Sequence, residues 1–435
     1  MKSTAVCTLV VLFCLTGVLH AAANPPAGFT ALFNGRDLSG WRGGDTFDHR
    51  KWLAMPAAER AAKQAEWTAD MLKHWRAEGD ELINDGEGRY ATTIKDFGDF
   101  ELLVDYKTVA GADSGIYLRG CPQVQIWDYT NQKNFAIGAD KGSGGLWNNS
   151  PCAPGKDPLV KADRPFGEWN HFRIRMVGAR VSVWLNEQLV IDHALLENYY
   201  DRETPVPPRG PIQLQTHGGE IRWRNIFLRE IDGEEANRLL ASHGDDGSFK
   251  PVFNGRNFTG WSGPVKNYHI VDGAIVCRPR KGGTIFTKEE FGDFVARQEF
   301  KIPPGGNNGL AIRYPGKGDG AYEGMTEIQV LDDRYEEVTG NKLDPRQAHG
   351  SAYGMVAAAR GYQRPTGEWN FQEVTVKGST IKVELNGTVI LNADLANVTE
   401  FMGKKHPGIN RTRGHFGLAG HNDPVAFRNL QIKPL

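Results

Sequence analysis

The sequence has little cysteine and no excess of either charge. Two of its five cysteines lie within the first 14 residues, and the other three form no Cys-x-x-Cys pair and no cluster with histidine. A structural zinc site is therefore not expected. Lysine and arginine number 51 against 52 aspartates and glutamates. This balance argues against a nucleic-acid-binding protein and against a polybasic membrane-surface protein.

Long hydrophobic runs are also scarce. One apolar run extends from Ala5 to Leu19, after an early lysine and before the small residues 21 to 23. The run is shorter than the ~20 residues that a membrane-spanning helix needs, and its layout is typical of a secretory signal peptide. We predict that residues 1–23 are removed and that the mature protein is exported to the periplasm or beyond the cell. We expect no transmembrane segment after cleavage, with a single membrane anchor as the alternative.

Export changes the interpretation of the remaining cysteines, which are Cys121, Cys152 and Cys277. In an oxidising compartment Cys121 and Cys152 could form a disulfide, whereas Cys277 has no partner in its own half of the chain. Three buried thiols are the alternative.

Glycine and tryptophan are abundant, at 52 and 11 residues, and most motifs occur twice. LFNGRDLSGW at 32–41 returns as VFNGRNFTGW at 252–261, and RPFGEWN at 164–170 returns as RPTGEWN at 364–370. Ordered repeats at this spacing indicate a duplicated globular domain of about 190 residues. We predict a first domain over 24–232, a linker over 233–247 and a second domain over 248–435. The stretch 232–247 is expected to form a short helix followed by a flexible linker.

Each copy shows a periodicity of two, which predicts β-strands. Phe172, Ile174 and Met176 alternate with polar residues, and Asn386 with Gly387 forms a strong hairpin signal. Many short strands with glycine-rich turns favour an antiparallel sandwich. Residues 50–78 are instead predicted to be a helical insertion. There Trp67, Met71 and Trp75 form a stripe that we expect to pack on the sandwich, with a substrate lid as the alternative.

The motifs FNGRDLSGW, SGIYLRG, QVQIWD, GEWN and LQTHGGEIRWRNIFLREI resemble those of the 3-keto-disaccharide hydrolase domain family. The resemblance covers both halves of the chain. It implies an all-β protein of two tandem concanavalin A-like jelly-roll sandwiches. It also implies cleavage of disaccharides or glycosides whose sugar carries a ketone at C3.

Candidate substrate-binding residues lie on the strand after the SGIYLRG turn. Strand alternation places Gln123, Gln125 and Trp127 on one face of the first copy, and Glu327 and Gln329 on the matching face of the second. Amides that bond hydroxyls and an aromatic ring under a pyranose are typical of sugar sites. An exposed polar face without a ligand is the alternative. The predicted substrate-binding set is completed by Asp128, Trp147, Gln215, Asp332 and Tyr353.

The predicted chemistry needs one base and one group that stabilises an oxyanion. A glycosidase with two carboxylates on one strand is disfavoured, because the first copy has none on this face and the second has only Glu327. A 3-keto sugar can instead lose its C2 proton, eliminate its aglycone and add water. The candidate catalytic residues are Glu327, Arg313, His349, His421, Arg119 and His217, with structural roles as the alternative for the arginines and histidines.

The two copies differ at these positions, and the second has more groups able to transfer protons. We therefore expect the second copy to be catalytic and the first to bind substrate or hold its partner domain. A divalent cation such as calcium could stabilise an enolate, but no ligand spacing identifies one, so no cofactor is assigned. The expected partner is an oligosaccharide or glycoside substrate. The alternative function is a non-catalytic, lectin-like protein with two carbohydrate-binding modules.

Overall fold

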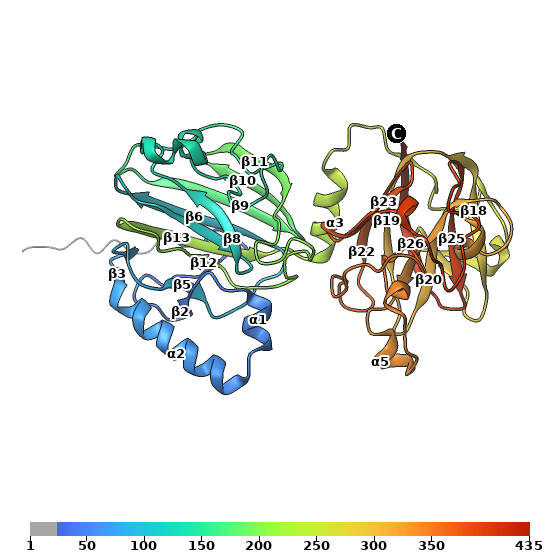
Figure 1. The fold of residues 1–435 in the computed structure, drawn as a ribbon, viewed down its shortest axis with the longest axis horizontal. Coiled ribbons are helices and arrows are strands. Elements are labelled where there is room, and N and C mark those ends of the chain that lie inside the picture. Colours follow the sequence, from blue (N-terminus) through green and yellow to red (C-terminus); the bar gives the residue numbers. More distant parts are fainter. Residues whose placement is uncertain (1–23) are drawn as a thin grey trace, which may run out of the picture.

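Alternating apolar residues build four antiparallel sheets, which pair into two sandwiches connected through one helix (Figure 1). The structure is a computed structural model that describes residues 24–435, so the predicted signal peptide lies outside the described residues. The predicted all-β tandem architecture is confirmed. No helix among the described residues is long and apolar enough to cross a bilayer.

The first copy pairs a larger and a smaller sheet. The larger sheet runs in the order β11 (Gln188–Leu195), β10 (Arg180–Leu185), β9 (Asn170–Val177), β6 (Phe100–Thr108), β13 (Ile221–Glu230), β4 (Glu81–Asn84) and β3 (Trp75–Glu78), with β1 (Thr30–Ala31) beside β13. The smaller sheet runs in the order β2 (Trp41–Gly44), β5 (Tyr90–Thr93), β12 (Gln213–Leu214), β7 (Ser114–Leu118) and β8 (Cys121–Ile126). Buried residues such as Ile116, Val124 and Ile174 fill the space between the sheets.

The second copy repeats this arrangement. Its larger sheet runs in the order β16 (Tyr268–Val271), β17 (Ala274–Cys277), β26 (Ala426–Pro434), β19 (Phe294–Lys301), β22 (Asn370–Lys377), β23 (Thr380–Leu385) and β24 (Thr388–Asp394), with β14 (Lys250–Pro251) beside β26. Its smaller sheet runs in the order β15 (Trp261–Ser262), β18 (Gly282–Phe291), β25 (Gly414–His421), β20 (Asn307–Tyr314) and β21 (Thr326–Leu331). Two short helices, α4 (Gly320–Glu323) and α5 (Tyr335–Thr339), lie in loops of this copy.

The motif that opens each copy closes its sandwich. Trp41 is buried and donates its indole N–H to the carbonyl of Leu32 at 2.8 Å, and Trp261 donates in the same way to Val252 at 2.9 Å. Within the turn, Asn34 accepts hydrogen bonds from two backbone N–H groups that follow it. The motif recurs because each sandwich needs the same closing turn.

Two helices of the first copy, α1 (His49–Ala54) and α2 (Ala57–His74), lie along its smaller sheet on the side of β2 and β5 (Figure 1). Trp67 and Met71 of α2 are buried, and the ring of Trp67 stacks on Trp52 of α1 at 5.6 Å. Trp75 is not part of the helix, because it begins β3. The insertion therefore packs on the sandwich.

Gly43 of β2 permits this packing. A Cβ atom at position 43 would overlap the backbone carbonyl of Trp67, and the Gly43 N–H donates to Thr68 at 3.0 Å. We expect Gly43→Ala to destabilise the first copy by about 1–3 kcal/mol, measured by chemical denaturation, because helix α2 must shift. Gly292→Ala is the matched control, since its added Cβ meets only one atom at 3.6 Å. An equal response of the two variants would contradict the tight approach of α2.

Helix α3 (Gly233–Ser242) joins the two copies and covers the larger sheet of the second (Figure 1). Ala236 and Leu240 pack against Val177 of the first copy and Phe371 of the second. Beside this cluster the guanidinium of Arg180 donates two hydrogen bonds to Glu384 across the interface, at 2.9 and 2.5 Å. The short helix expected between the two copies is therefore present, and it lies in their interface.

The cysteines form no disulfide within the described residues. Cys121 and Cys277 are buried free thiols, and Cys152 is an exposed free thiol. The thiol of Cys121 lies 3.4 Å from the backbone carbonyl of Glu197. The suggested Cys121–Cys152 bond is therefore not formed in this structure.

Candidate functional site

Each smaller sheet has one face against the larger sheet and one face turned away from it, which we call the polar face. Strand register makes the polar faces of the two copies directly comparable, because Gly115 pairs with Gln125 as Gly309 pairs with Gln329. The amide of Gln123 therefore occupies the position of the Glu327 carboxyl. By the same register the other matched pairs are Asp113 with Asn307, Gln215 with Ala419, and His217 with His421.

Glu327 is the most strongly perturbed group on the polar face of the second copy. Its side chain is 2% exposed, and its Oε2 atom has no hydrogen-bond partner among residues 24–435. Burial, with a smaller contribution from Asp319, raises the pKa of Glu327 to about 8. Its Oε1 atom lies 4.0 Å from Nε2 of His421, whose side chain is 42% exposed. A buried carboxyl without a partner beside an accessible imidazole is typical of a proton-transfer site.

Small residues under Glu327 let its carboxyl lie on the backbone of the sheet. A Cβ atom on Gly309 would overlap the carboxyl, so this position requires glycine. Ala311, Gly417 and Ala419 stand where the first copy has Tyr117, Gln213 and Gln215. The second copy therefore has three small residues around its carboxyl where the first copy has large polar side chains.

Polar and aromatic groups surround Glu327. Gln329 donates to the side-chain oxygen of Asn307 at 2.9 Å, and the Asn307 N–H donates to Asp423 at 3.1 Å. Burial raises the pKa of Asp423. The backbone N–H of Tyr353 donates to the Glu327 carbonyl, so Tyr353 lies beside strand β21. The Tyr353 ring meets the edge of the Tyr322 ring, with centroids 6.4 Å apart.

Three of these residues, Asn307, Tyr322 and Asp423, were not predicted from the sequence. Asn307 and Asp423 lie next to residues that repeat between the copies, so a comparison of the two copies extended beyond the strands would have found them. Tyr322 lies in a loop that the repeat does not preserve, and it carries no comparable signal.

The polar face of the first copy holds a row of hydrogen-bonded side chains. His217 contacts Asp113 at 2.9 Å, Gln125 donates to Asp113 at 2.7 Å, and Gln123 donates to Gln125 at 2.6 Å. The hydrogen bond with Asp113 raises the pKa of His217. Gln215 lies beside the row, with its amide nitrogen 3.5 Å from the Tyr117 hydroxyl. The predicted glutamines and His217 are therefore brought together on one face.

The structure does not bring Arg119 or Arg313 to either polar face. Both are almost completely buried. Arg119 pairs with Asp99 at 2.9 Å and donates to the carbonyl of Gly98, and Arg313 pairs with Asp293 at 2.7 Å and donates to Gly292. Protein acceptors occupy these guanidinium groups, so the expected oxyanion role is corrected to a structural one.

His349 also lies away from the polar face. It is buried against Phe300 of the larger sheet, with ring centroids 5.0 Å apart. Its Nδ1 atom accepts a hydrogen bond from the backbone N–H of Leu331, and burial lowers the pKa of His349 to about 3. A neutral imidazole between the sheets cannot reach a substrate on the polar face, so its predicted catalytic role is corrected.

Two predicted substrate-binding aspartates are turn residues. Asp128 accepts hydrogen bonds from the backbone N–H groups of Gly111 and Thr130, each at 2.8 Å. Asp332 accepts from the N–H groups of Gly305 and Arg334 at 2.8 and 3.2 Å. Both carboxylates satisfy loop backbone, and the predicted contact with substrate is corrected for each.

Of the three aromatic residues predicted to bind substrate, one is buried and two lie beside the polar faces. Trp127 is buried and meets the edge of Trp147 at 5.7 Å. Trp147 is partly exposed and follows Leu146, which bridges to Val124 of β8. The same bridge, between Ile328 and Ala352, places Tyr353 beside Glu327. Trp147 and Tyr353 are therefore the aromatic rings that flank the two polar faces.

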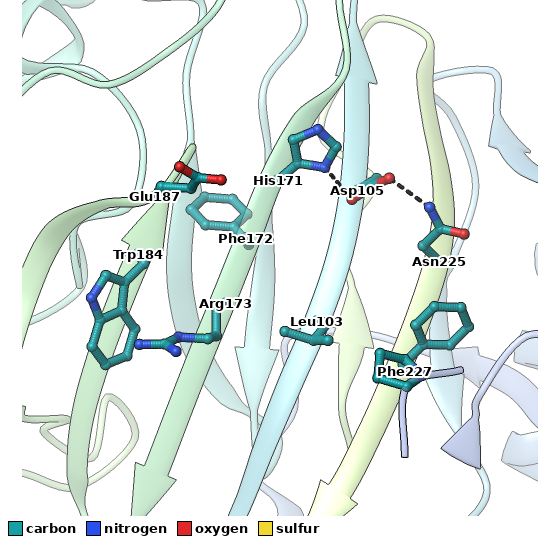
Figure 2. A pocket seen from close by; sticks show the side chains of 10 residues that line it. Leu103, Asp105, His171, Phe172, Arg173, Trp184, Glu187, Asn225 and Phe227 are labelled. Carbon is teal, nitrogen blue, oxygen red and sulfur yellow. Dashed lines mark hydrogen bonds and ion pairs between the residues drawn. The ribbon is translucent and has the colours of Figure 1, made fainter. Parts of the chain in front are cut away.

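A separate pocket of about 530 Å³ lies on the larger sheet of the first copy, on the side away from the smaller sheet (Figure 2). Its floor includes Trp184, whose ring is covered by the guanidinium of Arg173 at 3.8 Å. Its Asp105 carboxylate is already bonded by His171 at 2.6 Å and by Asn225 at 2.7 Å. Because these polar groups satisfy one another, this pocket lacks the unpaired buried acceptor that marks each polar face.

No group of three or more histidine, cysteine, aspartate or glutamate side chains in the described range 24–435 is placed to hold a metal ion.

Comparison with known proteins identifies relatives of both copies. The family model of the 3-keto-alpha-glucoside-1,2-lyase-like domain matches residues 28–229 and 248–433. A 3-keto-disaccharide hydrolase of Bacteroides thetaiotaomicron is 28% identical over 250 residues, which are 48% of this chain and 86% of that protein. A crystal structure of a putative glycosyl hydrolase from Parabacteroides distasonis is 25% identical over 45% of this chain and 97% of that chain, with a TM-score of 0.40. A carbohydrate binding module, CBM66 from Bacillus subtilis, is 16% identical over 41% and 97%, with a TM-score of 0.28.

Proposed function

Since this chain belongs to the 3-keto-alpha-glucoside-1,2-lyase-like domain family through both of its halves, we propose that it is an exported enzyme that cleaves the glycosidic bond of 3-keto-disaccharides or 3-keto-glycosides. The observation that carries the proposal is the unpaired, buried carboxyl of Glu327 beside His421. We place the reaction at the polar face of the second copy.

The proposed reaction has two stages. A ketone at C3 acidifies the hydrogen on C2, so the Glu327 carboxylate removes that proton and an enolate forms across C2 and C3. The C1–O bond then breaks, the aglycone leaves with a proton, and a double bond remains between C1 and C2. Water adds its hydroxyl to C1 and a proton returns to C2, so the sum is hydrolysis without oxidation or reduction.

Glu327 and His421 have separate roles in this scheme. Glu327 is the base, because its raised pKa makes its carboxylate a stronger base than an ordinary glutamate. His421, 4.0 Å away and accessible, protonates the departing aglycone oxygen. Tyr353 and Tyr322 flank the sugar, and Asn307 and Gln329 bond its hydroxyls.

The test is product analysis with a nitrophenyl glucoside and its 3-keto form, incubated in parallel in D₂O. We expect aglycone release from the 3-keto form alone, with one solvent deuterium at C2 of the sugar at the earliest time points. A sample without enzyme corrects for spontaneous exchange. Release from the unoxidised glucoside, or release without deuterium at C2, would contradict the elimination mechanism.

Absence of release from both glycosides, with sugar binding still measurable, would instead favour the lectin-like alternative. That alternative has one observation in its support, because the first copy carries an amide, Gln123, where the second copy carries its carboxyl. Parallel reactions with EDTA show whether a divalent cation contributes to release.

A further inference from the structure

We propose that the polar face of the first copy is a second sugar site, which binds a neutral pyranose by accepting hydrogen bonds from its hydroxyl groups and does not cleave it. This proposal rests on the proposed function only where it contrasts binding in the first copy with cleavage in the second. Its evidence lies in the first copy, in the row Gln123, Gln125 and Asp113 and in the neighbouring Gln213 and Gln215.

Asp113 sets the orientation of the whole row. An ionised carboxylate can only accept, so Gln125 must turn its amide nitrogen toward Asp113, at 2.7 Å. The Gln125 oxygen then faces Gln123, which must present its own amide nitrogen, at 2.6 Å. The Gln123 oxygen is thereby turned away from the row. Reversing either amide would place two acceptors in contact, so the observed direction is the stable one.

The result is a set of buried acceptors without donors. Within the part of the chain that the structure describes, the side-chain oxygens of Gln123, Gln213 and Gln215 have no hydrogen-bond partner, although these residues are only 4%, 4% and 6% exposed. The orientation of Gln213 is also constrained, because its nitrogen donates to Thr92 and to the backbone carbonyl of Asp45. Burying an acceptor without a donor is destabilising, and sugar hydroxyl groups that displace the surrounding side chains enough to reach these oxygens would recover part of that loss.

The chemistry of this face selects a neutral ligand. Its unpaired atoms are acceptors, which an anion cannot bond but to which the hydroxyl groups of an uncharged sugar can donate. Trp147, next to Gln123 through the Leu146–Val124 bridge, offers a partly exposed ring on which a pyranose can lie. Hydroxyl donors and an apolar ring face occur together in uncharged sugars.

Each copy has one carboxyl among the three positions that match the row Gln123, Gln125 and Asp113, but the carboxyls stand at opposite ends. The first copy has Asp113 with Gln123, and the second has Asn307 with Glu327. In the first copy the charge is held by His217 and Gln125, and the position equivalent to the proposed base is an amide that cannot take a proton. The first copy can therefore bind a sugar but lacks the base that the proposed cleavage needs.

The binding test uses the full chain with Glu327→Gln, so that no turnover at the second copy complicates the measurement. Maltose, cellobiose, sucrose and trehalose are titrated separately, with detection by calorimetry and by tryptophan fluorescence. We expect at least one of these disaccharides to bind at one site per chain. Adding Gln215→Ala should weaken that binding at least tenfold, and Ala419 shows that alanine fits the equivalent position.

Asp113→Asn provides a second variant that keeps the shape of the side chain. It removes the constraint on both amides, so we expect it to weaken binding about as much as Gln215→Ala. Gln188→Ala, at an exposed position on β11, is the control that should bind like its parent. Circular dichroism and thermal unfolding confirm that each variant is folded.

Two results would overturn the proposal. One is the absence of binding of all four disaccharides by the folded parent, and the other is unchanged affinity in both Gln215→Ala and Asp113→Asn. Either result leaves the cleavage test untouched, because that test follows product release by the unmodified chain. Conversely, failure of cleavage with intact disaccharide binding would reject the proposed function alone.

Discussion

Glu327→Gln is expected to lower kcat for a 3-keto glycoside by about 10²–10⁴-fold, the usual contribution of a positioned base. Glutamine keeps the size of the side chain but cannot accept the C2 proton. Because the pKa of Glu327 is about 8, the ionised fraction of this base should increase as pH rises toward 8, while His421 must stay protonated to act as the acid, so activity should pass through a maximum. Initial rates between pH 5 and 9.5 measure both effects.

The same substitution should stabilise the fold at neutral and alkaline pH. Glu327 keeps its proton up to about pH 8 when folded, whereas the unfolded chain loses it near 4.5, so the unfolded state binds fewer protons between these values. Stability then falls as pH rises through this window. Glutamine has no such proton, so we expect a gain on the order of 3 kcal/mol at pH 7, from roughly 1.4 kcal/mol per pH unit, and no gain at pH 4.

Glu337→Gln is the control for both measurements, since that side chain is 70% exposed and pairs only with Arg334 in the same loop. It should leave activity and stability unchanged. Full activity in Glu327→Gln, combined with loss of activity in His217→Ala, would move the reaction to the first copy.

Arg119→Met is expected to destabilise the first copy by about 3 kcal/mol, because the change removes the closest cation of Asp99 and leaves buried carbonyl groups without their donor. Arg119 is 1% exposed, and it bonds Asp99 and the carbonyls of Gly98 and Pro207. Asp99 would keep the Gly178 N–H at 2.8 Å and the more distant Arg364 guanidinium at 4.0 Å. The midpoint of urea-induced unfolding, followed by near-ultraviolet circular dichroism, measures the loss.

Arg334→Met is the matched control, because the Arg334 side chain is 60% exposed and should contribute within about 0.5 kcal/mol. Arg313→Met should also destabilise the second copy, mainly because the carbonyls of Gly292, Gly378 and Arg411 lose their donor, since the Asp293 side chain is 39% exposed. An unchanged unfolding midpoint together with a large decrease in kcat would contradict the structural role and restore the oxyanion hypothesis.

Local patterns in the sequence predicted much of the candidate site. Because strand side chains alternate, Gln123 with Gln125 and Glu327 with Gln329 could each be assigned to one face, and the structure places each pair on a polar face. The paired histidines 217 and 421 follow from the same repeat. Local patterns failed for His349 and the two arginines, because a repeated polar residue can serve the interior as well as a site.

The sequence alone was sufficient for the duplication, the antiparallel strands and the family resemblance, since each depends on neighbouring residues and on short repeats. Only the tertiary structure could show which polar side chains find partners. Arg119 meets Asp99 from 20 residues away, whereas Oε2 of Glu327 meets no donor. The difference between a structural ion pair and a reactive carboxyl depends on burial and on contacts between distant segments, which no short stretch of sequence specifies.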